Sequence, residues 1–230
     1  MYNTAPSHIA NQADPQPRCT LAYATSDNVA LEFFRKAARQ PARLGILPAA
    51  FNPPTRAHLA LAQSALATVD EVIFVLPRGF PHKAYEDATF DQRVQMLMAA
   101  TATEPRYSIA GSDRGLFIEI AGECREEYGQ DARLLFICGR DTAERIVAWD
   151  YGEPDAFRPM LDQFELLVAS RQGEYEPPAE IRDRVHALDV PAEISEISAT
   201  EVRDRLRRGA HWEHLVPSQI VPLVRQIYPP

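Results

Sequence analysis

The sequence has few cysteines, no long apolar run and no excess of positive charge. Its 230 residues include only three cysteines. They are widely separated and lack metal-ligand spacing, which indicates reduced thiols rather than a disulfide framework or a zinc site. No apolar run approaches the roughly 18 residues that a membrane-spanning helix needs, and no basic start precedes an apolar stretch at the N-terminus. We therefore expect a cytoplasmic protein with no membrane partner.

The charge balance narrows the class of ligand. Lysine and arginine number 24 against 32 aspartates and glutamates, so the formal net charge is -8. A general nucleic-acid binder would carry a basic surface, so we expect no nucleic-acid partner. A single nucleotide needs only local positive charge and stays possible. The hydrophobic content of 46% is enough for the core of one α/β domain of this length.

The chain divides into three parts by composition. Residues 1–25 are polar, contain proline and show no periodicity, which predicts a disordered tail. Apolar residues at helical spacing then predict an added helix over 26–40, either packed on the outside of the domain or contacting another copy in a homo-oligomer. Residues 41–230 show no low-complexity linker and are predicted to form a single domain.

The stretch 44–66 combines a short apolar run, a tight turn and a helical pattern that starts near Arg56. This order places a helix N-terminus, with its free N–H groups and positive dipole, at the exit of a strand. Thr55 can cap that helix, and His58 lies within its first turn. The stretch therefore predicts a phosphate site. Further apolar runs at 70–77, 133–138 and 163–170 predict parallel strands covered on both faces.

The residues Phe51, Asn52, Pro53, Thr55 and His58 resemble the signature of the nucleotidyltransferase superfamily, Gly-x-Phe-(Asp/Asn)-Pro-x-(His/Thr)-x-x-His. The Asn and Thr variants are similar to those of the nicotinate and nicotinamide mononucleotide adenylyltransferases. Three later segments resemble the same family in the same order. They are Pro81-His82-Lys83, Gly139-x-Asp141 followed by Trp149, and the run 197–203 with Ser198, Thr200 and Arg203.

The run 197–203 also has a physical reading. It predicts a second helix N-terminus, with Ser198 as cap, Thr200 in the first turn and Arg203 about one turn further on. Hydroxyls, free amides and an arginine together suit a phosphate. Ser198 with Glu201 also fits a capping box, so a purely structural role for Ser198 stays open.

The resemblance covers residues 43–228 and implies a Rossmann-like α/β fold, with a parallel sheet and helices on both faces. It implies transfer of the adenylyl group of ATP to nicotinate or nicotinamide mononucleotide, with release of pyrophosphate, in NAD biosynthesis. Its implied partners are these small molecules, with Mg²⁺ bound to ATP and no metal ligands from the protein. The implied catalytic residues are His58, Thr55 and Arg203.

The remaining expected contacts divide between the two substrates. On the nucleotide side the resemblance places Phe51, Asn52, Lys83, Gly139, Asp141, Ser198 and Thr200. On the acceptor side it places Arg93, Trp149, which offers a flat face for a pyridine ring, and Arg171. Asp141 has a second reading as the N-cap of a helix over 142–148.

Two segments depart from the family pattern. Pro48, Ala49 and Ala50 stand where glycines are usual, so a methyl group can narrow the nucleotide site and Pro48 offers no N–H. The segment 117–120 replaces a Thr-Ile-Asp-Thr-like run near the acceptor. Two alternatives therefore stay open. One is a sister transferase that uses ATP or CTP with another phosphorylated acceptor, and the other is a catalytically weakened nucleotide-binding protein.

Overall fold

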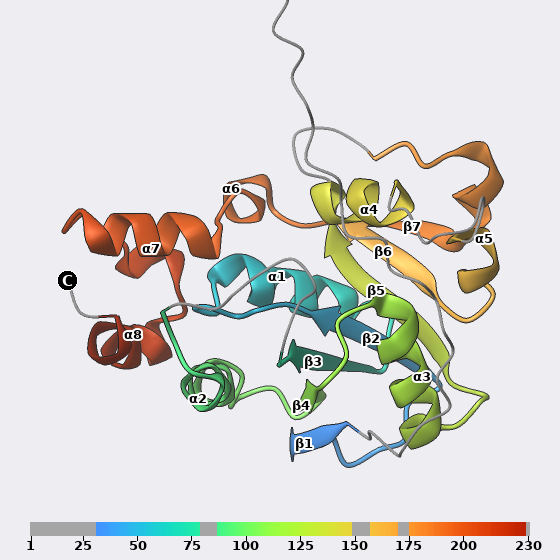
Figure 1. Ribbon diagram of the computed structural model, residues 1–230, viewed down its shortest axis with the longest axis horizontal. Helices are drawn as coiled ribbons and strands as arrows, with labels where there is room; N and C mark the ends of the chain where they lie inside the picture. The colour runs from blue at the N-terminus through green and yellow to red at the C-terminus, as the bar shows by residue number, and fades with distance from the viewer. Residues whose placement is uncertain (1–30, 79–86, 149–156, 170–174, 229–230) are drawn as a thin grey trace, which may run out of the picture.

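The computed structural model describes residues 31–78, 87–148, 157–169 and 175–228 (Figure 1). Within these residues seven strands form one sheet. The strands are β1 Glu32–Arg35, β2 Arg43–Pro48, β3 Glu71–Pro77, β4 Tyr107–Ser112, β5 Arg133–Gly139, β6 Glu165–Ala169 and β7 Val185–Leu188. The α-helices are α1 Arg56–Ala65, α2 Phe90–Ala100, α3 Phe117–Tyr128, α4 Arg140–Val147, α5 Phe157–Met160, α6 Ala192–Ser195, α7 Ala199–Arg207 and α8 Val221–Ile227. The 3₁₀ helices are Ala179–Arg184, Glu213–Leu215 and Ser218–Ile220.

The strand order is β1-β4-β3-β2-β5-β6-β7, and every pair except β1–β4 is parallel. Ile46 in β2 lies opposite Ile73 of β3 on one side and Phe136 of β5 on the other. The chain builds outward from β2 in one direction through β3 and β4, and then in the other through β5, β6 and β7. The direction therefore switches between β2 and β5, where open α/β sheets bind ligands at the carboxyl ends of their strands.

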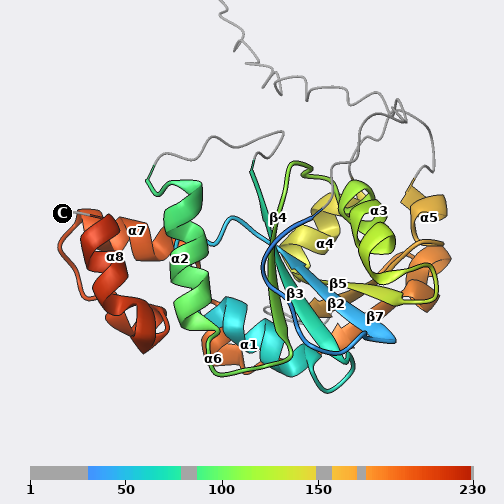
Figure 2. The same ribbon diagram turned by 90° about the horizontal axis from the view of Figure 1, so that it is seen from below.

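The side chains of β3 show how the sheet is covered on both faces. Val72, Phe74 and Leu76 pack in one hydrophobic cluster with residues of α1 and α2. Ile73 and Val75 alternate with them and pack in a second cluster with α3, α4 and α5. Figure 2 shows α2, α7 and α8 on one side of the sheet and α3 and α5 on the other. The predicted Rossmann-like α/β fold with helices on both faces is confirmed.

A third hydrophobic cluster joins α7 and α8 to α2. Met96 of α2, Val202 of α7, Val224 of α8 and Trp212 between those two helices are all buried in it. Because α2 already packs on the sheet, this cluster attaches the C-terminal helices on the side of α2 away from the sheet, as Figure 2 shows. The helix that carries the second predicted phosphate site is thereby fixed beside the first.

The N-terminal helix predicted over 26–40 is wrong where it can be examined. Residues 26–30 lie outside the described residues, and β1 occupies Glu32–Arg35 as an antiparallel edge strand on β4. Phe33 packs against Tyr128 of α3, with ring centroids 6.3 Å apart, and Phe34 packs against Phe90 of α2 at 5.9 Å. Adjacent phenylalanines thus face opposite sides of the sheet, which requires an extended chain. The open hydrogen-bonding edge of β4 outweighed the local helical spacing.

Two expectations from composition can be compared with the structure. Cys124 and Cys138 are buried free thiols, and burial raises the pKa of Cys138 to about 12. Cys19 and the tail predicted over 1–25 lie outside the described residues. None of the helices in the described part of the chain is long and apolar enough to cross a membrane.

Candidate active site

The turn that leaves β2 has a constrained backbone. Phe51 adopts a φ of 48°, in the left-handed region that residues other than glycine rarely occupy. Its ring is 1% exposed and packs between His58, at 5.0 Å between centroids, and Phe74, at 5.7 Å. The next peptide bond, Asn52–Pro53, is cis. A residue other than glycine at positive φ, such as Phe51, is found most often at functional sites, and the Phe51 ring here contacts His58 in the first turn of α1.

Thr55 and His58 bond to each other at the start of α1. The Thr55 hydroxyl accepts the His58 backbone N–H at 3.4 Å, and His58 Nδ1 accepts the Thr55 N–H at 2.9 Å. Because Nδ1 is an acceptor, the proton of the neutral imidazole lies on Nε2. Thr55 is fully buried. Its role in this geometry is to orient His58, which then offers an N–H donor at the helix N-terminus.

The residues of the second predicted phosphate site lie at the start of α7. Ser198 is the N-cap and accepts the Glu201 N–H at 3.1 Å. The Glu201 carboxylate pairs with Arg205 one turn later, at 2.7 Å, rather than with the cap residue. Thr200 is exposed, and its hydroxyl accepts from Arg203 Nη2 at 3.4 Å. A hydroxyl pair and a guanidinium therefore meet at one helix N-terminus, as predicted.

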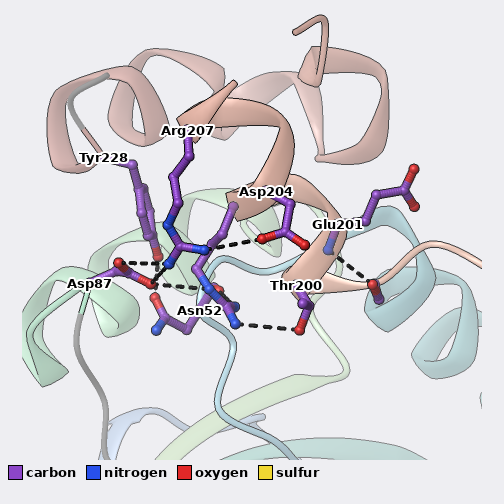
Figure 3. A network of polar contacts seen from close by, with 9 residues as sticks. Asn52, Asp87, Thr200, Glu201, Asp204, Arg207 and Tyr228 are labelled. Atoms are coloured by element: carbon purple, nitrogen blue, oxygen red, sulfur yellow. Dashed lines mark hydrogen bonds and ion pairs between the residues drawn. The ribbon is translucent and has the colours of Figure 1, made fainter. Parts of the chain in front are cut away.

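Arg203 joins the two sites. Its Nη1 donates to the backbone carbonyl of Asn52 at 2.6 Å, across 151 residues of sequence. The side chain of Asn52 is also engaged, because its Oδ1 accepts from the buried hydroxyl of Tyr228 (Figure 3). Burial raises the pKa of Tyr228, so this hydroxyl stays a donor at neutral pH. The turn after β2, the start of α7 and the end of α8 thus converge.

Arg93 is neither on the surface nor open to solvent. It is 2% exposed, its Nη1 donates to the carbonyl of Ala50 at 2.9 Å, and its guanidinium carbon lies 5.5 Å from the Phe90 ring centroid. The N–H of Ala49 bonds to the Val75 carbonyl at 3.2 Å. Arg93 and β3 therefore hold the segment that lacks the usual glycines. The expected contact of Arg93 with the acceptor stays a prediction.

The end of β5 supplies the opposite wall of the switch point. Gly139 is the cap residue of α4, and a Cβ added there would meet nothing within 4 Å. Packing with neighbouring residues therefore does not require a glycine at position 139. The space beside Gly139 is open and leaves room for a ligand to approach the backbone. Asp141 is exposed in the first turn of α4, which begins at Arg140. Its alternative reading as the N-cap is wrong, because the helix starts two residues earlier than predicted.

The side chains of the altered segment 117–120 pack in the core or cap α3. Phe117 stacks on Phe136 with centroids 4.2 Å apart, and Ile118 and Ile120 are buried. The Glu119 carboxylate accepts the N–H groups of Gly115 and Leu116, at 3.3 and 3.1 Å. These four side chains therefore form and cap the start of α3, which explains why they differ from residues that would contact an acceptor.

Three predicted residues, Lys83, Trp149 and Arg171, lie outside the described residues. Two residues of the network around Arg203, Asp87 and Tyr228, were not indicated by any sequence pattern. Asp87 lies four residues beyond Lys83 but belongs to no recognised pattern. No group of three His, Cys, Asp or Glu side chains arranged for a metal ion occurs among the residues that the structure describes.

The fold and the site define a nucleotidyltransferase: a doubly wound sheet with two helix N-termini, a histidine and an arginine gathered at its switch point. A profile of the cytidylyltransferase-like family matches residues 46–205. A probable nicotinate-nucleotide adenylyltransferase of Moorella thermoacetica is 32% identical, over 81% of this chain and 90% of its own length. One of Salinispora arenicola is 33% identical, over 77% and 97%. The chain belongs to the cytidylyltransferase-like family and groups within it with the nicotinate-nucleotide adenylyltransferases.

A solved structure shares the fold. Nicotinic acid mononucleotide adenylyltransferase of Plasmodium falciparum, in its complex with NaAD, superposes with a TM-score of 0.62 at 17% identity. The match covers 80% of this chain and 95% of that one. The architecture is therefore retained where little of the sequence is.

Proposed function

We propose that this protein transfers the adenylyl group of ATP to nicotinate mononucleotide. The observation that carries the proposal is the bond from Arg203 to the Asn52 carbonyl, which brings both helix N-termini to one site. Two helix starts, an Nε2–H and a guanidinium suit a triphosphate. The names of the relatives at 32 and 33% identity support nicotinate as the acceptor base.

In the proposed reaction, a phosphate oxygen of the mononucleotide attacks the α-phosphorus of ATP. A new P–O bond forms, the bond from the α-phosphorus to the bridging β-oxygen breaks, and its electrons leave with pyrophosphate. The acceptor phosphate is already a nucleophile, so no general base is needed. Catalysis comes from alignment and from neutralising charge on the phosphates. We assign His58 Nε2–H and Arg203 to that charge, with Thr55 orienting His58.

The donor set fits a magnesium ion that arrives with ATP. In the described network around Arg203, the side-chain oxygens include the Thr200 hydroxyl, the Asn52 amide oxygen, which accepts from Tyr228, and the Asp87 carboxylate, which is already paired with two arginines. Oxygens of the triphosphate and water would therefore supply most of the coordination, and the ion would offset part of the triphosphate charge. We assign no protein carboxylate to it.

The test is pyrophosphate release with Mg²⁺, crossing ATP and CTP with nicotinate and nicotinamide mononucleotides. We expect release with ATP and nicotinate mononucleotide, falling by about 100-fold or more in His58→Ala, as when one donor to a developing charge is removed. His211→Ala, an exposed histidine outside the site, is the matched control and should retain activity. Preference for CTP or for nicotinamide mononucleotide would change the substrate assignment. No release from any pair, in protein that still binds ATP, would contradict the proposal.

A further inference from the structure

Asp87 contacts two arginines of α7, although it belongs neither to the start of α1 nor to the start of α7. Its Oδ2 lies 3.1 Å from Nε of Arg203 and 3.3 Å from Nη2 of Arg207. Arg207 in turn bonds Asp204 at 3.1 Å. Figure 3 shows Asp87 under α7, with contacts to the helix above it. The result is an alternating row of charges that connects the residues before α2 to α7.

Arg203 is held on three sides by three different parts of the chain. Nε contacts Asp87, Nη1 donates to the Asn52 carbonyl, and Nη2 donates to the Thr200 hydroxyl. The guanidinium is a rigid plane, so fixing these edges fixes the direction of every N–H. Each Nη carries a second N–H that can bond a phosphate oxygen. Of the three contacts, the one from Asp87 is the only ion pair.

The ion pair between Asp87 and Arg203 is partly shielded from solvent, so it can restrain the Arg203 side chain. The side chains of Arg203 and Asp87 are 22% and 28% exposed, whereas that of Arg207 is 59% exposed. Electrostatic attraction is stronger at such half-buried positions than on an open surface. An arginine on a helix has many rotamers, and a charge partner that selects one removes that freedom before the substrate binds.

We propose that Asp87 is a positioning residue, which fixes the Nε edge of Arg203 so that its Nη edge meets the triphosphate. This inference rests on the proposed function, because that function makes Arg203 a phosphate contact. It differs from a competing role, in which Asp87 occupies the place of a phosphate and is displaced by ATP. Contact at Nε, away from the second N–H of each Nη, favours positioning.

The first arm of the test requires no turnover. The Nε–H resonance of Arg203, assigned with Arg203→Lys, is followed by NMR in wild type, Asp87→Asn and Asp204→Asn. Asp204→Asn removes the same charge from the same row without touching Arg203. We expect slow solvent exchange of this proton in wild type and in Asp204→Asn, and fast exchange in Asp87→Asn. Unchanged exchange in Asp87→Asn would overturn the proposal.

The second arm uses steady-state kinetics with ATP and nicotinate mononucleotide. Asp87→Asn should lower kcat about 10- to 100-fold while KM for ATP changes less than about threefold, since a misplaced group costs rate more than binding. Asp87→Glu, which keeps the carboxylate, should recover most of the rate. In the Arg203→Lys background, Asp87→Asn should cause little further loss, because it acts through Arg203.

The outcomes separate the two proposals. A fall in KM for ATP with kcat retained would identify Asp87 as a competitor and overturn positioning, as would additive losses in the double mutant. Wild-type protein without turnover would contradict the proposed function. The exchange rate of the Arg203 proton would then still decide the role of Asp87, in either direction.

Discussion

Thr55 stands where the commoner motif of this superfamily has its first histidine, and in the proposed reaction it acts by orienting His58. The hydroxyl and N–H of Thr55 are both directed to His58, at 3.4 and 2.9 Å. Thr55 is fully buried, so it contributes through the orientation of the imidazole. An imidazole whose Nδ1 is already an acceptor presents a donor at Nε2 without reorganisation, which is the arrangement that favours charge stabilisation.

Glu123 is a second residue whose environment sets its protonation. It is 6% exposed, its Oε2 accepts the Ser112 hydroxyl at 2.6 Å, and its Oε1 has no hydrogen-bond partner among the described residues. Burial raises the pKa of Glu123 to about 7, against smaller opposing effects of the Ser112 hydrogen bond and then of Arg114. The folded protein therefore holds a proton here at pH values where the unfolded chain has released it.

Replacing Glu123 tests this consequence for stability. Because the pKa is raised on folding, the contribution of Glu123 is full below about pH 4.5 and is lost as pH rises to about 7. Glu123→Gln removes this dependence. We expect the variant to be more stable than wild type at pH 8, by at most about 3 kcal/mol, and about equal to it near pH 4.5. Urea unfolding at both pH values measures the difference.

Glu126→Gln is the control for that experiment. Glu126 is an exposed residue on the same helix, α3, so its replacement removes an equal charge without changing the core. Its stability should follow the wild-type curve with pH. Parallel curves for wild type and Glu123→Gln would show that Glu123 is not protonated in the folded state near neutral pH.

At the scale of helices and strands, local signals predicted most of the sheet. β3 is buried along its whole length, and its residues from Val72 to Pro77 form an unbroken apolar run. The helices α1 and α7 begin where Thr55 and Ser198 indicate. The strand β1 could not be predicted in this way. Its pairing depends on the free edge of β4, more than 70 residues later, as the bond from Arg35 to the Tyr107 carbonyl illustrates.

In the candidate site, too, local spacing predicted some contacts, whereas contacts between distant parts of the chain could not be predicted. Ser198, Thr200 and Arg203 fall within one helical turn or so, and their sequence spacing predicted their meeting. Asp87 is 120 residues from its partner Arg207, and no local pattern relates them. The burial of Arg93 likewise follows from the packing of α2 on the sheet, which the sequence of that helix does not specify.

Ala49 provides a test at the scale of an element. Its N–H continues the β2–β3 ladder to Val75, and Arg93 holds the neighbouring Ala50 carbonyl. The backbone path is therefore fixed without glycine. We expect Ala49→Gly to lower the free energy of unfolding by about 0.5–1 kcal/mol, through added backbone entropy, and to change kcat/KM for ATP by less than about threefold. Denaturant unfolding and steady-state kinetics measure both.

Ala102→Gly, in an exposed turn, is the control for the general effect of an added glycine. A gain in kcat/KM of tenfold or more in Ala49→Gly alone would have a different meaning. It would show that the methyl group narrows the nucleotide site, and that the glycine-rich pattern of the family serves the substrate rather than the strand.

At the scale of the whole molecule, the site depends on the last helix of the chain. The Tyr228 hydroxyl donates to Asn52 Oδ1 across 176 residues, and both residues are 6% exposed. The third hydrophobic cluster packs α8 against α2, and the hydrogen bond from Tyr228 joins the end of α8 to the turn after β2. The C-terminal helix thereby completes the wall of the turn that holds Phe51 and Arg203 in place.

Tyr228→Phe keeps the packing and removes only that hydroxyl. The buried amide oxygen of Asn52 would lose its donor, so we expect a loss of about 1–2 kcal/mol in the free energy of unfolding. We also expect a fall in kcat/KM, because the Asn52 carbonyl that receives Arg203 belongs to the loosened turn. Tyr107→Phe is the matched control, since its hydroxyl makes only a 3.4 Å contact to Gln63. If both variants lose the same stability and keep full activity, α8 serves the core alone. If only Tyr228→Phe loses activity, the Tyr228 hydroxyl helps to position the turn after β2 that contacts Arg203.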